Sequence, residues 1–259
     1  MSAERNTLAT SEDAVLGGRL RLRQPLRGHR VGHDAILLAA ATRARAGEVA
    51  VDLGAGVGAA GLALAVRVEG LKVTLVEIDQ ALCSLAADNA QLNRLSEQVR
   101  VLESDAENIQ ALAAAGLIRG RAERVLMNPP FNDPARQNVS PDPRRRLAHV
   151  GEQALLSRWA ATSAWLLKPQ GVLTLIWRAD GLPEVLDTLQ AEFGSLAILP
   201  VLPRASASPI RVLVRAVKGG ASSATPLSYP GLILNDEKGQ PTAAAEAVMR
   251  GGETLRIAD

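Results

Sequence analysis

Aromatic residues are scarce in this chain: its 259 residues include three tryptophans, two phenylalanines and one tyrosine. Proteins that bind single-stranded nucleic acid on a broad stacking surface need several exposed aromatic rings, because successive bases stack on successive rings. Six aromatic residues spread over the whole chain argue against a surface of that kind.

Potential metal ligands and membrane-directed segments are also scarce. Cys83 is the only cysteine, and the three histidines form no cluster, so we expect no internal disulfide and no metal site. The first fifteen residues carry charges throughout and lack the apolar segment of a secretory signal. Apolar runs such as 57–66 are too short to span a bilayer. These absences predict a cytoplasmic protein without a membrane partner, and nothing in the sequence distinguishes a monomer from a homodimer.

The overall charge does not indicate a partner, because 29 basic residues against 27 acidic ones leave a net charge of only +2. The basic residues nevertheless gather in two clusters. One consists of Arg19, Arg21, Arg23, Arg27, His29 and Arg30, and the other of Arg136, Arg144, Arg145 and Arg146. Either cluster can contact the phosphates of an RNA. The alternative is that both are solvated faces of strands and loops.

The central part of the chain, residues 48–218, alternates short β-branched runs with longer stretches rich in alanine and leucine. This alternation is typical of βαβ units and of a mostly parallel sheet. We expect strands at 49–53, 72–77, 99–102, 124–127, 172–177, 196–202 and 211–216. A Pro- and Ser-rich link joins the last two, which predicts an antiparallel hairpin at the sheet edge. The predicted fold class is α/β, with seven strands and helices on both faces.

Two smaller segments flank this core. In residues 1–47 we expect a mobile start, then a strand where charged and apolar residues alternate over 19–23, and a helix from His33. Pro25, Gly28 and Gly32 suggest that the strand belongs to a hairpin. Residues 219–259 begin with a linker-like segment, and we expect one short extended piece and one short helix after it.

A glycine-rich turn follows the first strand of the core. Its residues are Gly54, Ala55 and Gly56. Glycines let the backbone pass close to a ligand, and the helix that follows offers unpaired amides. Residues 56–61 also fit the dinucleotide pattern G-x-G-x-x-G, with Glu77 at a suitable distance to hold a ribose. Asp52, directly before the turn, favours another ligand, because its carboxylate attracts the ammonium of a methionine moiety and repels a diphosphate.

The next two strands also end at acidic residues. Glu77 can accept hydrogen bonds from both hydroxyls of a ribose, and Ile78 beside it can pack on an adenine. Asp105, followed by Ala106, can accept a hydrogen bond from the adenine amine. The alternative for Asp105 is that it caps the next helix.

The fourth strand ends in the sequence Asn128-Pro129-Pro130-Phe131. In an open α/β sheet, residues at this position face the ligand crevice. The Asn128 side-chain oxygen and the Pro129 carbonyl can accept both protons of an amino group, while Phe131 stacks on the planar group that bears it. That geometry directs the nitrogen lone pair toward a methyl donor. The alternative, that these residues are only a turn, leaves the neighbouring acidic strand ends unexplained.

Together these motifs resemble the class I S-adenosylmethionine-dependent methyltransferases with an NPPF motif, and most closely the tRNA (adenine-N6) methyltransferase family. The resemblance covers residues 16–217 and includes the stretch Gly32-His33-Asp34-Ala35-Ile36-Leu37-Leu38 and the strand from Arg211 to Val214. It implies a Rossmann-like class I fold and methylation of adenine N6 in tRNA. It further implies that S-adenosylmethionine is held by Gly32, Asp34, Asp52, Gly54, Ala55, Gly56, Glu77, Ile78, Asp105, Ala106 and Asn128.

Several other functions remain open at this point. Groups with the same NPP motif methylate guanine N2 in ribosomal RNA or the side-chain amide of a glutamine in release factors. A nicotinamide-dependent oxidoreductase fits the glycine pattern but leaves the NPPF sequence unexplained. An RNA-binding module that keeps the cofactor pocket only for structural reasons is a further possibility.

Overall fold

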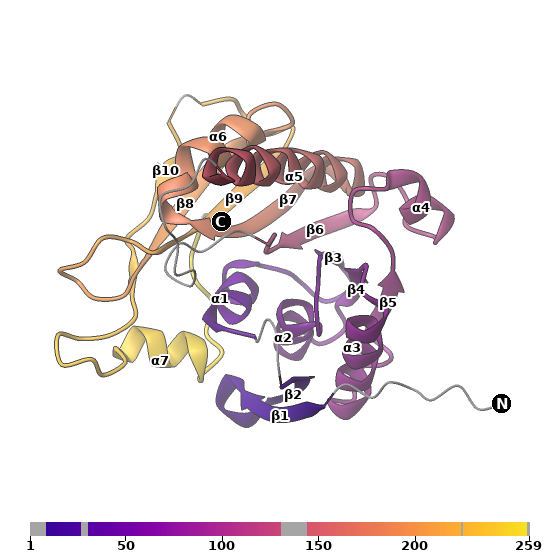
Figure 1. The fold of residues 1–259 in the computed structure, drawn as a ribbon, viewed down its shortest axis with the longest axis horizontal. Helices are drawn as coiled ribbons and strands as arrows, with labels where there is room; N and C mark the ends of the chain where they lie inside the picture. The colour runs from indigo at the N-terminus through magenta and orange to yellow at the C-terminus, as the bar shows by residue number, and fades with distance from the viewer. Residues whose placement is uncertain (1–8, 27–30, 131–143, 224, 258–259) are drawn as a thin grey trace.

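The computed structural model describes residues 9–26, 31–130, 144–223 and 225–257, with only the backbone from 144 to 152. Its centre is one large sheet with the strand order β10-β8-β9-β7-β6-β3-β4-β5, and β11 also pairs with β8 (Figure 1). The strands are β3 (Val49–Leu53), β4 (Lys72–Glu77), β5 (Val99–Glu103), β6 (Ala122–Met127), β7 (Leu167–Arg178), β8 (Phe193–Leu202), β9 (Arg211–Lys218), β10 (Leu227–Ser228) and β11 (Leu232–Ile233). Only β9 runs antiparallel to its neighbours.

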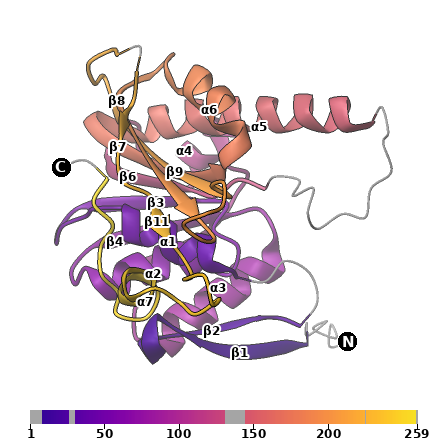
Figure 2. The same ribbon diagram turned by 90° about the vertical axis from the view of Figure 1, so that its left-hand side faces the viewer.

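Helices cover both faces of this sheet (Figures 1 and 2). One face carries α1 (His33–Ala41), α2 (Ala59–Arg67) and α3 (Gln80–Leu92), and the other α4 (Ile109–Ala114), α5 (Arg144–Leu166) and α6 (Leu182–Leu189). Because side chains alternate along a strand, Ile176 packs among the first set and Trp177 among the second, both with no exposed surface. The expected α/β fold with a mostly parallel sheet and an antiparallel hairpin of β8 and β9 is confirmed.

Within the part of the chain that the structure describes, the sheet has nine strands rather than seven. The two additional strands, β10 and β11, have two residues each and pair in parallel with β8. They belong to the tail, which also contains the short helix α7 (Ala243–Met249) packed against α1. A strand of two residues is too short to show an alternation of apolar and polar residues, so these two strands are not predicted from the sequence.

The N-terminal hairpin pairs differently from the sequence prediction. Its strand β2 (Leu20–Pro25) pairs with β1 (Thr10–Val15), and Leu16–Gly18 forms the turn between them. The partner strand therefore precedes β2, within the segment that we expected to be mobile, and Pro25 ends β2 rather than opening a turn to a later strand. Leu20 and Leu22 of β2 are fully buried, whereas β1 has no buried residue. Only β2 therefore shows the alternation of apolar and polar residues by which a strand is recognised in a sequence.

The hairpin lies against α2 and α3, on the side of these helices away from the sheet (Figure 2). Two asparagines attach it there, one within α3 and one at its C-terminal cap. Asn89 accepts a hydrogen bond from the Arg23 amide (2.7 Å) and donates to its carbonyl (3.0 Å), and Asn93 makes the same pair of bonds to Arg21. The two side chains therefore supply the hydrogen bonds that a third strand would otherwise make.

Among the described residues, no helix is both long and apolar enough to cross a lipid bilayer.

Candidate active site

The strand order reverses direction between β3 and β6, since β4 and β5 lie on one side of β3 and β7 on the far side of β6. Ligands of open α/β sheets bind at such a point, outside the carboxyl ends of the strands. Leu53 pairs with Met127 of β6 and with Val76 of β4, so the residues that follow these strands leave the sheet at the same level. Gly54, Glu77 and Asn128 are therefore brought together at one edge, as the motifs predict.

The glycine turn at this edge has a left-handed backbone, with φ of +66° at Gly54 and +58° at Gly56. Glycine adopts such angles without strain. A Cβ on Gly54 would overlap the ring of Trp159 from α5, whereas a Cβ on Gly56 would meet nothing within 4 Å. The turn is thus packed closely on its Trp159 side and has open space beside Gly56, where a ligand can approach the backbone.

The Glu77 carboxylate holds this turn in place. One oxygen accepts the Gly56 amide (2.8 Å), and the other accepts the amides of Ile78 and Asp79 (both 2.9 Å). A carboxylate has about four acceptor positions, and the three amides occupy most of them. Roughly one position remains for a ligand hydroxyl, and another becomes available if the Gly56 amide releases its hydrogen bond. Ile78 beside it is 66% exposed, so its apolar side chain is open to a ligand next to a buried carboxylate.

Asp52 lies below the turn and is only 2% exposed. Its carboxylate accepts a hydrogen bond from the Gly61 amide in the first turn of α2 (2.8 Å). Burial raises the pKa of Asp52 to about 7, against the lowering effect of the Gly61 amide and with a smaller contribution from the charge of Glu77. A positive charge near this carboxylate would favour its ionised form.

The third strand end contributes Ser104, Asp105 and Ala106. Asp105 accepts a hydrogen bond from the Glu107 amide (2.9 Å), whereas the cap of α4 is Asn108, whose side chain accepts the Ala111 amide. The alternative that Asp105 caps this helix is therefore wrong. The Ser104 hydroxyl is buried without a hydrogen-bond partner, so this strand end has a polar group that can still bind a ligand.

Asn128 follows β6 and is half-buried, Pro129 is buried, and Pro130 is exposed. Phe131 lies outside the described residues, as do Arg30 and Arg136 of the basic clusters. The side chains of Arg144, Arg145 and Arg146, in the first turn of α5, are not described either.

The two other segments that carry the family resemblance, residues 32–38 and 211–214, contact each other in the structure. Gly32 is the N-cap residue of α1, and Asp34 in its first turn accepts a hydrogen bond from the guanidinium of Arg211 at the start of β9 (3.0 Å). This ion pair joins segments 177 residues apart in sequence.

The arginines of the hairpin have partners within the chain. Arg21 and Arg23 both pair with Glu12 of β1, and Arg19 donates to the Gly251 carbonyl of the tail (2.7 Å). Arg21 and Arg23 remain about half exposed. They share one carboxylate, so the exposed face of the hairpin keeps a positive charge.

Two residues at this edge were missed from the sequence. Trp159 packs on Gly54, and Asn89, fully buried, donates a hydrogen bond to the Val57 carbonyl in the glycine segment (3.0 Å) as well as binding the hairpin. The only sequence signal for Asn89 is its spacing of four from Asn93, which places both side chains on one face of α3.

Comparison with known proteins agrees with this geometry. The family model described as "Methyltransferase small domain" matches residues 30–200. The "tRNA1(Val) (adenine(37)-N6)-methyltransferase" of Porphyromonas gingivalis is 31% identical over 160 residues, 60% of this chain and 61% of that protein. The "Release factor glutamine methyltransferase" of Chlorobaculum tepidum is 29% identical over 155 residues, 58% of this chain and 52% of that protein. The chain thus spans between half and two thirds of these curated relatives.

Among solved structures, a predicted O-methyltransferase of Agrobacterium tumefaciens superimposes with a TM-score of 0.72 at 28% identity, covering 86% of this chain and 98% of that one. The family model includes the glycine turn, the acidic ends of β4 and β5, and Asn128. The chain therefore belongs to the methyltransferase small domain family.

Proposed function

We propose that this protein transfers a methyl group from S-adenosylmethionine to an exocyclic amine, adenine N6 of a tRNA. The observation that carries the proposal is the alignment of the carboxyl ends of β3, β4 and β6, which brings the glycine turn, Glu77 and Asn128 to one edge. Family membership and the relatives named as tRNA methyltransferases support the reaction and the substrate class.

Four features of this edge fit S-adenosylmethionine. Space is open beside Gly56 for the methionine part of the cofactor, and Glu77 has acceptor capacity for a ribose hydroxyl. Ile78 exposes an apolar surface on which an adenine ring can pack, and the buried Ser104 hydroxyl, next to Asp105, lacks a partner. When bound, the cofactor supplies the electrophilic methyl group.

The chain's own residues orient the attacking nitrogen. The Asn128 side-chain oxygen and the Pro129 carbonyl accept the two amine protons, so the lone pair is directed away from them and toward the methyl donor. The reaction needs this alignment more than a strong base, because the nitrogen becomes acidic once it is methylated and can lose its proton to water.

The proposal is tested by incubating the purified protein with radiolabelled S-adenosylmethionine and, separately, bulk tRNA, ribosomal RNA and release factor. We expect label in tRNA, recovered as N6-methyladenosine after digestion. Label in the release factor alone would favour glutamine methylation, the second candidate, which the Chlorobaculum tepidum relative supports. No transfer to any of the three would contradict the proposal.

The role of Asp52 gives a separate prediction. If its carboxylate faces the cofactor's ammonium, binding lowers the pKa of Asp52 from about 7 and releases up to about one proton at pH 6, where an α-amine is already protonated. Calorimetry in two buffers of different ionisation enthalpy measures this release. We expect it to vanish in Asp52→Asn, which keeps an acceptor for the Gly61 amide.

The same pKa affects stability. The folded-state pKa of Asp52 lies above its unfolded value, so the folded protein binds more protons between about pH 4 and pH 7, and the free energy of unfolding falls as the pH rises through that window. Asp52→Asn should remove this slope in the cofactor-free protein. If the wild-type protein releases no proton on binding the cofactor but its stability still depends on pH in this way, Asp52 only holds the first turn of α2 and does not face the ammonium.

A further inference from the structure

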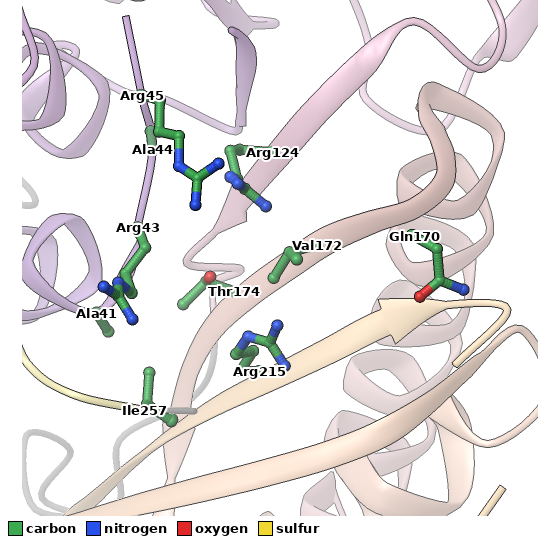
Figure 3. Close-up of a pocket in the computed structure, with 10 residues that line it drawn as sticks. All are labelled: Ala41, Arg43, Ala44, Arg45, Arg124, Gln170, Val172, Thr174, Arg215 and Ile257. Carbon is green, nitrogen blue, oxygen red and sulfur yellow. The ribbon is translucent and has the colours of Figure 1, made fainter. Parts of the chain in front are cut away.

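A cavity of about 540 Å³ opens at the opposite edge of the sheet, near the amino ends of β6 and β7. Four arginines line it: Arg43 and Arg45 from the segment after α1, Arg124 from β6 and Arg215 from β9. Figure 3 shows their guanidinium groups around one space with Thr174 among them, and Gln170 lines the cavity farther away. Arg124 precedes Asn128 by four residues of extended chain, about 13 Å, so this cavity is distinct from the candidate active site.

A second cavity of about 350 Å³ adjoins the first and shares Arg43 with it. Arg19 and Arg67 line it as well. We call the two cavities together the arginine trough, defined by Arg19, Arg43, Arg45, Arg67, Arg124 and Arg215. Among the described residues that line the trough, none is acidic.

Two of these arginines, Arg19 and Arg67, are held in place by neutral partners and keep their positive charge. Arg19 donates to the backbone carbonyls of Leu16 and Gly251. Arg67 donates to those of Ala39 and Gly252, and all four carbonyls are neutral acceptors. Arg124 is instead paired with both oxygens of Glu48 (2.9 and 3.0 Å), whose charge compensates its own. A guanidinium has five N–H donors, so one that donates to two carbonyls keeps others for a ligand.

This arrangement suits one ligand chemistry in particular. Phosphate groups bind arginine through pairs of parallel hydrogen bonds, and several guanidinium groups around one space attract multiply charged anions most strongly. We propose that the arginine trough binds the phosphate groups of an anionic ligand, supplied either by an RNA backbone or by a free phosphorylated molecule. This inference does not depend on methyl transfer at the other edge.

The first test uses inorganic pyrophosphate and the full-length protein, by calorimetry at low ionic strength. We expect saturable binding that Arg45→Gln weakens about 10-fold, the usual effect of losing a hydrogen bond between charged groups. Arg45 is exposed in a connecting segment, so its replacement leaves the core intact. Arg215→Gln should act in the same direction, with its folding checked by circular dichroism.

The matched control is Arg100→Gln, an exposed arginine on β5, far from the trough in the same sheet. We expect its pyrophosphate affinity to equal that of the wild type. Absence of pyrophosphate binding, or equal weakening by Arg45→Gln and Arg100→Gln, would overturn the proposal.

A second arm identifies the source of the phosphate. RNA binding is measured over a range of salt concentrations with an unstructured oligonucleotide. If the trough holds an RNA backbone, Arg45→Gln lowers the salt dependence by about 0.7 per lost contact and pyrophosphate competes with the RNA. If RNA affinity is unchanged while pyrophosphate binding is lost, the ligand is a free phosphorylated molecule.

Discussion

Replacing Asn128 by alanine is expected to lower the turnover number for methyl transfer by roughly 30- to 1000-fold, which corresponds to about 2 to 4 kcal/mol in the activation barrier. The side-chain oxygen at this position orients the amine for attack, and that orientation matters most in the transition state. The resemblance also places Asn128 among the cofactor-binding residues, but the glycine turn and Glu77 follow other strands and stay in place, so cofactor affinity should fall far less than turnover. Single-turnover kinetics and cofactor titration, performed on the same preparation, separate the two effects.

Asn128→Asp is the matched control for this experiment. A carboxylate can still accept hydrogen bonds from the amine, so this variant should retain more activity than Asn128→Ala. Full activity in Asn128→Ala would mean that the amine is held elsewhere and that the segment after β6 is only a turn.

Glu77→Ala is expected to reduce the affinity for S-adenosylmethionine by about 100-fold or more. This change removes a ribose acceptor and also releases the Gly56 amide, so the glycine turn loses the bond that fixes its shape. The amides of Ile78 and Asp79 lose their acceptor as well, and the melting temperature of the cofactor-free protein should fall. Calorimetry measures the affinity, and thermal unfolding without cofactor measures the structural part.

Glu103→Ala provides the comparison, because Glu103 lies directly opposite Glu77 on β5 but is exposed. We expect its cofactor affinity to stay close to that of the wild type. If Glu77→Ala binds the cofactor as tightly as Glu103→Ala does, Glu77 only supports the turn and does not contact the cofactor.

The core strands were predictable because they are buried on both faces. Val49–Leu53 and Lys72–Glu77 have the bounds that the sequence predicts, since each is a short apolar run enclosed by polar or glycine residues. The edge that carries the candidate site follows from the same reasoning: once the strands are parallel, the residues that end them must lie together.

Contacts made by single side chains across long separations were not predictable. Asn89 looks like an ordinary polar residue of a helix, and Trp159 like a core residue, until the fold places them against the glycine segment. Strand β1 was missed for a related reason, because none of its side chains is fully buried and its polar sequence carries no apolar period. The arginine trough is likewise invisible in sequence, since its members come from five separate segments.

The short strands of the tail have a consequence for solubility. An outermost strand presents a row of unpaired N–H and C=O groups on which another chain can add, and the ten-residue strand β8 would be outermost if the tail did not pair with it. Residues of the tail occupy that row: Leu227–Ser228 and Leu232–Ile233 pair with β8, and the Tyr229 and Leu234 amides bind its Ile198 and Leu202 carbonyls. The tail therefore covers part of this sheet edge, which leaves fewer free backbone groups for another chain to pair with.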